Sequence, residues 1–176
     1  EQEVWLAVLT YSPEEARNAR YLERFCSGVT TAVYERRSPL AHLPKLADYA
    51  VHGRPLELVF QYSQDLFDEI TRLTSVEDFD IVHIEHSYNA LYAEAISGEH
   101  DCKRMLVFRN ILFDQYARMF RVEWRPTIKM RYWLNSKLMR RWEPSFAQRF
   151  DRLIALSRTD RDKLLAVNPR LRFDVI

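Results

Sequence analysis

The chain has 176 residues and a net charge of +1, with 47% hydrophobic and 29% charged residues, as expected of one ordinary globular domain. Its three glycines, at positions 28, 53 and 98, exclude a GxGxxG or Walker loop, which would cradle nucleotide phosphates. Cys26 and Cys102 lie far apart and outside any CxxC pair, which favours a reduced, cytoplasmic setting. No apolar run approaches the roughly 20 residues of a membrane span.

Short apolar runs alternate with helical stretches along the chain. The runs predict strands at Val4–Leu9, Val29–Tyr34, Ile81–Ile84, Met105–Phe108, Leu153–Leu156 and Phe173–Ile176. Strands that alternate with helices indicate crossover connections and a parallel sheet. The predicted fold class is therefore α/β, a Rossmann-like parallel sheet with helices on both faces.

Three of the intervening stretches carry clear helical patterns. Pro13–Phe25 has Pro and two acids in its first turn, which marks a helix start. Leu56–Leu73 places its apolar residues at helical spacing, and this predicts a second helix. Ser157 is predicted to be the N-cap of a third, with Asp160 placed to reach back to it.

The segment 113–150 is long, aromatic and basic. From Arg118 to Arg149 it has nine Lys or Arg against two glutamates, a net charge of +7. Its apolar residues Ile128, Tyr132, Met139, Trp142 and Phe146 share one helical face. Pro144 lacks an N–H, so we expect the helix to kink or restart there.

Two interpretations of the basic residues remain open. One is contact with an anionic membrane surface through Arg118, Arg121, Lys129, Lys137, Arg140 and Arg141. The other is a buried helix whose basic face is simply solvated. Nucleic-acid binding is disfavoured, because the aromatic side chains mostly follow the core face of the helix.

Polar residues follow the predicted strands at the edge where open parallel sheets bind ligands. The third predicted strand is followed by Glu85, His86 and Asn89, and a role in the site and a helix-capping role fit these residues equally. The fourth predicted strand is followed by Arg109 and Asn110. Arg109 is placed to clamp a phosphate or carboxylate, with a surface ion pair to Asp114 as the alternative.

His83 lies inside an apolar run and is predicted to be a packed core histidine. The sequence 83–86, HIEH, is one residue short of HxxEH, and a strand cannot provide the helical spacing of that motif, so a metal site is disfavoured. Neither cysteine has a neighbouring histidine, which disfavours a nucleophile.

These pieces resemble a known family. The similarity is carried by FDIVHIEHSYNALYAEAI, by RMLVFRNILFDQYARMF and by the stretch from RRWEPSFAQRFDRLIALSRTDRDKLLAVNP to FDVI. Together they resemble the N-terminal half of the retaining family 4 glycosyltransferases, which have the two-domain GT-B fold. The resemblance implies sugar transfer from a nucleotide-sugar donor to a glycan or lipid-linked acceptor. It implies no metal and no cofactor.

The resemblance also suggests roles for the residues at the sheet edge. In the family a His-Asn pair follows the strand that matches Met105–Phe108, and the His lies at the transfer centre. Here Asn110 matches and Arg109 replaces the His, so Arg109 is the catalytic candidate. The substrate-binding candidates are Glu85, His86, Asn89 and Asn110. The setting implied is cytoplasmic, peripheral to the inner face of the membrane.

The family comparison predicts how the domain is bounded. Residues 1–176 are expected to form a single acceptor-side domain, with the family's first strand and its C-terminal donor domain outside this sequence. In the family's order that strand sits between those matching Val4–Leu9 and Ile81–Ile84, so we expect a gap between these two. The chain alone is then expected to be inactive. The alternative is a stand-alone, non-catalytic α/β binding module.

Overall fold

A computed structural model describes residues 2–34, 39–96 and 102–176 of the chain. Its strands are β1 Trp5–Thr10, β2 Gly28–Val33, β3 Ile81–Glu85, β4 Lys103–Phe108, β5 Arg152–Ala155 and β6 Phe173–Val175. Each of the six predicted strands is confirmed, with both ends within two residues of the prediction.

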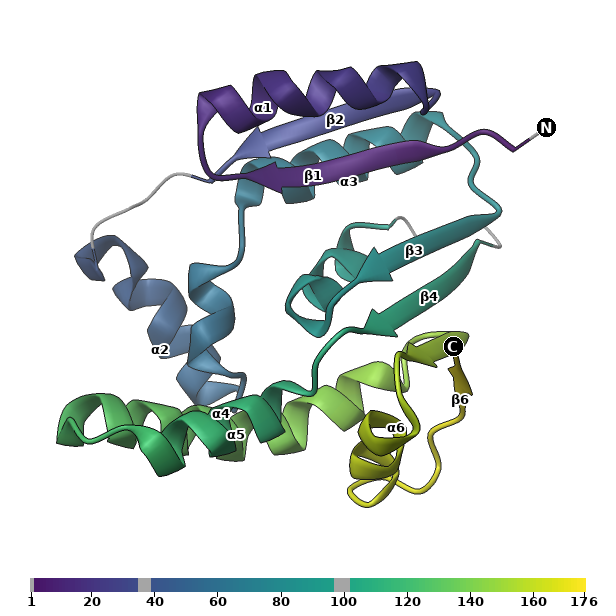
Figure 1. The fold of residues 1–176 in the computed structure, drawn as a ribbon. Coiled ribbons are helices and arrows are strands. Elements are labelled where there is room, and N and C mark those ends of the chain that lie inside the picture. Colours follow the sequence, from purple (N-terminus) through teal and green to yellow (C-terminus); the bar gives the residue numbers. More distant parts are fainter. Residues whose placement is uncertain (1, 35–38, 97–101) are drawn as a thin grey trace.

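Along the chain the helices come between the strands, and in space they flank the sheets (Figure 1). The α-helices are α1 Pro13–Ala19, α2 Leu43–Val51, α3 Gln64–Val76, α4 Leu112–Val122, α5 Pro126–Ala147 and α6 Arg158–Leu165. The 3₁₀ helices are η1 Arg20–Arg24, η2 Pro39–His42, η3 Leu56–Phe60 and η4 Ser87–Ala95. Parallel sheets flanked by helices are the predicted Rossmann-like α/β class.

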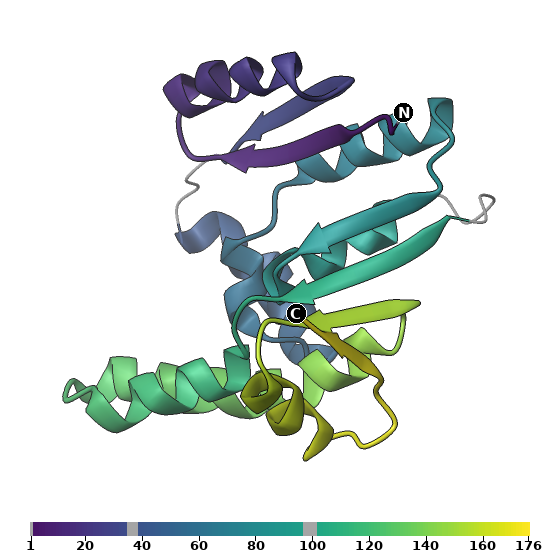
Figure 2. The same cartoon turned by 45° about the vertical axis from the view of Figure 1, so that its right-hand side comes forward.

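The strands form two parallel sheets. One has the order β1-β2 and the other has the order β3-β4-β5-β6. β1 and β3 run in the same direction with a gap between them, which both ribbon views show (Figures 1 and 2). The strands predicted at Val4–Leu9 and Ile81–Ile84 are therefore not hydrogen-bonded to each other, as expected.

Each sheet has its own core. The larger core fills the space between the four-stranded sheet and the helices around it, and Leu106, Phe108, Leu112, Met139 and Leu164 in it are at most 1% exposed. The smaller core is built on Ala32 of β2, Leu66 of α3 and Tyr92 of η4. Because α3 also packs against β1, it connects the two-stranded sheet to η4 of the larger part.

One helix prediction is wrong in detail, and of the kink or restart predicted at Pro144 the restart is absent. The stretch Leu56–Leu73 is divided into η3 and α3, because Ser63 begins α3 as its N-cap, and its N–H donates to the Tyr92 hydroxyl at 2.8 Å. α5 does not restart at Pro144 but runs through it to Ala147. The predicted helix at Pro13–Phe25 is present as α1, which continues as η1.

The basic segment forms a helical hairpin, in which α4 and α5 pack along each other and project beyond the sheets (Figure 1). Met139, Trp142 and Phe146 on the predicted apolar face are buried, whereas Ile128 and Tyr132 are half-buried. At the tip of the hairpin, Val122 at the end of α4 and Trp124 in the connection are each 82% exposed.

Candidate functional site

The chain leaves β3 through a turn at His86 that has an unusual backbone conformation. His86 has φ 73° and ψ 135°, a combination that residues other than glycine rarely adopt. Its N–H donates to the Val107 carbonyl at 2.9 Å, and its own carbonyl accepts from the Asn89 N–H at 3.0 Å. The Asn89 side-chain amide also donates to the Glu85 carbonyl at 2.9 Å. These bonds hold the strained turn in place.

The His86 imidazole is half-buried at this turn. Its ring stacks on Tyr88 with centroids 4.8 Å apart, and its Nδ1 accepts the Tyr88 N–H at 3.3 Å. Nδ1 is therefore unprotonated, and in the neutral ring the proton is on Nε2. Burial, and then the positive charge of Arg109, lower the pKa of His86. His86 thus provides a neutral hydrogen-bond donor at this edge.

Arg109 lies at the end of β4, beside Glu85 at the end of β3. Its Nε is 3.5 Å from Glu85 Oε2, and both side chains are more than half exposed. An ion pair this exposed is weak, so the guanidinium remains available to a ligand. The alternative pair with Asp114 is wrong, because Asp114 instead binds Lys163 at 2.8 Å and Arg118 at 3.4 Å. Asn110 follows Arg109 and is exposed.

The prediction that His83 is a core residue is wrong. Its side chain is 47% exposed, and its Nε2 lies 3.4 Å from Glu85 Oε1. Along β3, His83 shares a face with Ile81 and Glu85, which are also exposed. That face of the strand is open to solvent, whereas Val82 and Ile84 face the core.

Glu143 of α5 is a buried carboxylate that joins both loops of the site. It is 1% exposed, and its Oε1 accepts the Ser87 hydroxyl at 2.7 Å and the Leu112 N–H at 3.0 Å. Its Oε2 accepts the Phe113 N–H at 3.0 Å. Ser87 follows His86, and Leu112 begins the helix after Arg109 and Asn110. One carboxylate therefore fixes the spacing of the two loops.

Burial raises the pKa of Glu143 to about 7, although its three hydrogen-bond donors favour the ionised form. Sequence reasoning missed this residue. The available signal was a glutamate four residues from Met139 and beside Trp142, on the predicted core face of the helix.

A pair of tyrosines makes a second link between η4 and α4. The hydroxyls of Tyr88 and Tyr116 are 2.8 Å apart, and burial raises the pKa of each phenol. Because Tyr88 also stacks on His86, this hydrogen bond helps to fix the position of the imidazole ring. Sequence reasoning missed this pair as well.

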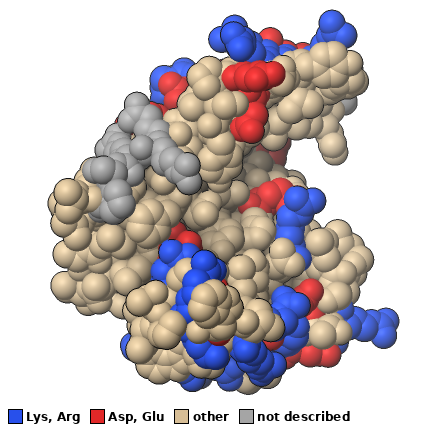
Figure 3. All heavy atoms as spheres, turned by 60° about the vertical axis from the view of Figure 1, so that its left-hand side comes forward, with Lys and Arg blue, Asp and Glu red and all other residues tan. Residues whose placement is uncertain are grey.

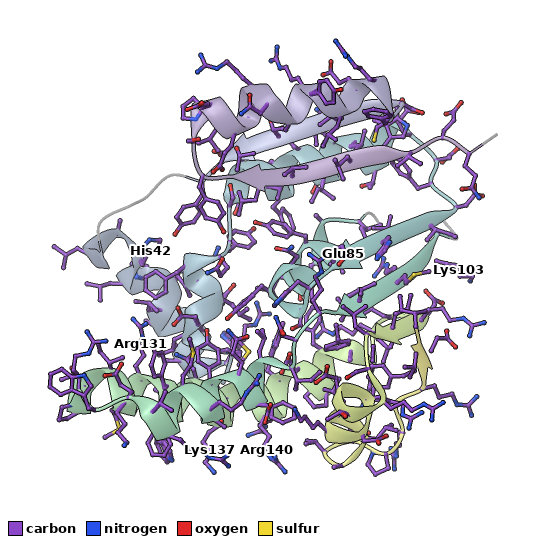
Figure 4. All side chains as sticks on the ribbon, in the orientation of Figure 1. His42, Glu85, Lys103, Arg131, Lys137 and Arg140 are labelled. Atoms are coloured by element: carbon purple, nitrogen blue, oxygen red, sulfur yellow. The ribbon has the colours of Figure 1, made fainter. Side chains whose placement is uncertain are left out.

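A groove of about 370 Å³ opens beside the site, between β1 and β3. Glu85 and Asn89 line its end at the carboxyl edge, and Figure 3 shows the surface hollowed between the two-stranded part and the rest. Figure 4 shows Glu85 at the end of β3, facing this space.

The structure therefore brings Glu85, His86, Asn89 and Arg109 to one edge, with Asn110 beside them. Ser157, at the next strand end, caps α6 as predicted, since its hydroxyl accepts the Asp160 N–H at 3.1 Å. Within residues 2–34, 39–96 and 102–176, no three His, Cys, Asp or Glu side chains are grouped as a metal site requires.

The predicted membrane-contact residues lie on the helical hairpin. Five of the six, Arg118, Arg121, Lys137, Arg140 and Arg141, are exposed, and Lys129 is half-buried. Lys137 and Arg140 project from the underside of α5, away from the sheets (Figure 4). No helix in the part of the chain that the structure describes is both long and apolar enough to cross a bilayer.

Comparison with known proteins gives one family. The family model described as Glycosyltransferase Family 4 matches residues 8–176. A sequence search of curated proteins found no match to the chain. The match covers β1 from Val8 onward, the other strands, the hairpin and every candidate site residue. The chain therefore belongs to glycosyltransferase family 4.

Proposed function

We propose that the chain is the acceptor-side domain of a retaining glycosyltransferase, which transfers a sugar from a nucleotide-sugar donor to a glycan or lipid-linked acceptor. The observation that carries the proposal is an exposed arginine at the carboxyl edge of the sheet in a chain of this family. Within the described residues, Arg109 makes a weak, exposed ion pair there with Glu85.

Each residue of the edge has a role in this reaction. Arg109 offsets the negative charge that develops as the nucleotide diphosphate leaves, the kind of charge that preorganised cations stabilise. His86 donates from Nε2 to a sugar or phosphate oxygen. Glu85, Asn89 and Asn110 bind acceptor hydroxyls. The reaction needs neither a metal nor a cofactor in this domain.

Donor binding is assigned to a second domain outside this sequence. A transition state formed between two domains needs groups from both, so residues 1–176 alone are proposed to be inactive. Calorimetry of this chain with a panel of UDP- and GDP-sugars tests the assignment. Submillimolar binding would contradict it.

The test of the site is Arg109→Ala in the protein that includes its donor domain. We expect turnover to fall by about 100-fold or more, as when one charge-stabilising group is removed, with the midpoint of unfolding unchanged. Arg152→Ala is the matched control, because Arg152 is also exposed and makes a loose ion pair, at 3.6 Å with Asp174, but it lies at the opposite end of its strand. Near-normal turnover of Arg109→Ala would exclude the proposed role.

We further propose that the hairpin contacts an anionic membrane at the cytoplasmic face. Exposed Val122 and Trp124 lie at its tip, and Met130 is 63% exposed nearby. Exposed Arg121 is next to Val122 in sequence, and the exposed Arg118, Lys137, Arg140 and Arg141 lie farther along the hairpin. Each Lys or Arg near such a surface contributes about 1 kcal/mol. Tryptophan and apolar side chains are suited to the membrane interface.

Co-sedimentation with vesicles of anionic or neutral lipid tests this contact. We expect binding to the anionic vesicles that Trp124→Ala weakens by about 5-fold, since one interfacial aromatic is lost. Phe25→Ala is the control, because Phe25 is 71% exposed but lies outside the hairpin. Equal, negligible binding to both vesicles would leave the basic face as a solvated surface.

A further inference from the structure

The turn at His86 keeps an imidazole where the backbone favours glycine. With φ 73° and ψ 135°, a glycine would adopt this conformation without strain, whereas any side chain there has a conformational cost. Strain of this kind persists only where the surrounding structure holds it, and it is concentrated at functional sites. The contacts that hold this turn are therefore candidates for a role in the reaction.

One of these contacts comes from a distant part of the chain. Ser87, the residue after His86, is 1% exposed, and its hydroxyl donates to Glu143 Oε1 at 2.7 Å. A hydrogen bond to an ionised carboxylate is stronger than one between neutral groups. Because Glu143 belongs to α5, the strained turn is bound to a helix of 22 residues as well as to the neighbouring strand β4.

The same carboxylate caps the N-terminus of α4. The N-cap position is occupied by Ile111, whose side chain cannot accept a hydrogen bond, so the first N–H groups of the helix need another partner. Glu143 provides it, since its Oε1 accepts from the Leu112 N–H and its Oε2 from the Phe113 N–H, both at 3.0 Å. The helix dipole also favours a carboxylate at this end.

The position of this cap constrains the loop that carries Arg109. The loop consists of residues 109–111, between the last residue of β4 and the first residue of α4. So short a loop has little freedom once both of its ends are held. β4 is paired with strands on both sides, and Glu143 holds the start of α4. The turn at His86 and the loop at Arg109 are therefore both bound to one carboxylate.

We propose that Glu143 is a positioning residue of the transfer reaction. Through Ser87 it holds the strained turn of His86, and through the N-terminus of α4 it holds the loop of Arg109. The imidazole and the guanidinium thus face the reacting atoms in one fixed arrangement. Displacing such groups by about 1 Å can slow a reaction about 100-fold. The catalytic part of this inference rests on the proposed function.

Two serine variants separate positioning from stability. Ser87→Ala removes the bond between Glu143 and the His86 turn but leaves both bonds to α4 in place. Ser136→Ala is the matched control, because the Ser136 hydroxyl also joins α5 to a neighbouring helix, donating to the Phe113 carbonyl of α4 at 3.0 Å. The control bond does not involve the turn. If Glu143 only stabilised the fold, the two variants would differ in no other property.

Hydrogen exchange of residues 1–176 tests the contact itself. The His86 N–H donates to the Val107 carbonyl and reports on the turn. We expect this amide to exchange about 10-fold faster in Ser87→Ala, the effect of losing one hydrogen bond to a charged group, and at the normal rate in Ser136→Ala. Equal exchange of this amide in the two variants would overturn the proposal.

Kinetics of the protein that includes its donor domain test the catalytic part. We expect Ser87→Ala to lower kcat by about 10-fold and to change KM by less than about 2-fold, because the displaced groups act in the transition state. Ser136→Ala should retain normal kcat. A kcat that followed Tm in the same way in both variants would show a structural role and overturn the proposal.

Glu143→Gln provides a second variant of the same contact. The amide keeps the size of the side chain but has one acceptor oxygen in place of two, so one of the three donors loses its partner. We expect its kcat to fall at least as far as that of Ser87→Ala, and normal kcat would overturn the positioning role. Failure of the proposed function is seen separately, because near-normal turnover of Arg109→Ala excludes that function whatever the result for Ser87→Ala.

Discussion

The four-stranded and two-stranded parts of the molecule are built from the same βα pattern but differ in how well they are buried. β4 has partners on both sides, and Leu106, Val107 and Phe108 at its end are buried. Among the described strands β1 pairs with β2 alone, and Thr10 is the single buried residue of β1. A two-stranded sheet is marginal by itself and depends on what packs against it.

This difference shows how stability is divided along the chain. The four-stranded part encloses a continuous core, and Glu143 fixes its two site loops from within. The two-stranded part depends on α3, whose Leu66 contacts the small core and the groove at once. The proposed site therefore lies on the four-stranded part, and the groove opens beside the two-stranded part.

The largest expected effect separates the two cores. Leu106→Ala should lower the free energy of unfolding by about 4 kcal/mol, because Leu106 is 1% exposed and its removal leaves a cavity in a well-packed sheet. Leu66→Ala should instead deprotect the amides of β1 and β2 while those of β4 exchange as before. Hydrogen exchange of both variants measures this. Uniform loss of protection in Leu66→Ala would show that the parts unfold together.

The strands could be predicted from the sequence because each is a local apolar run that needs no distant partner to be recognised. Phe108 ends one such run and Ala155 is the next-to-last residue of another, and both are fully buried. The family resemblance rested on the same local stretches. Glu85, His86, Asn89 and Arg109 could be grouped because the carboxyl ends of parallel strands share one edge.

Features that depend on distant contacts could not be predicted in this way. The break at Ser63 depends on the Tyr92 hydroxyl, 29 residues away, and Glu143 binds Ser87 across 56 residues. His83 was expected in the core because its neighbours in sequence are apolar. It is exposed because one face of β3 is open, a property of the arrangement of helices and not of the run itself.

The second prediction uses the pH dependence of stability to test the role of Glu143 in the four-stranded part. The pKa of Glu143 is raised by burial to about 7, so its protonated form is favoured in the folded state. Because the pKa of Glu143 is higher in the folded state than in the unfolded state, protonation of Glu143 stabilises the fold. This stabilisation is complete below the pKa of the unfolded state and is lost as pH rises through the pKa of the folded state. Unfolding free energy should therefore fall by about 3 kcal/mol between pH 4.5 and 7.5.

Glu143→Gln removes the titration but keeps the shape of the side chain. Denaturant unfolding of both proteins at the two pH values is the measurement, and the variant should lack the decrease assigned to Glu143. Parallel pH profiles would show that its hydrogen bonds to Leu112 and Phe113 offset the cost of burying the charge.

The smallest expected effect is at α3, the helix that connects the two-stranded part to the four-stranded part. Ser63 is 8% exposed, and its hydroxyl accepts the Leu66 N–H at 3.4 Å at the start of α3. Ser63→Ala should cost about 1 kcal/mol, the usual value of an N-cap, and the loss should appear as faster exchange in α3 and β1 rather than in β4. Ser12→Ala removes the exposed N-cap of α1, whose hydroxyl accepts the Glu15 N–H at 3.1 Å, and is the matched control. Because α1 lies outside this connection, that variant should leave α3 unchanged. If Ser63→Ala instead accelerated exchange in β4, α3 would unfold with the four-stranded part. The boundary between the two parts would then lie at β1 and not at the groove.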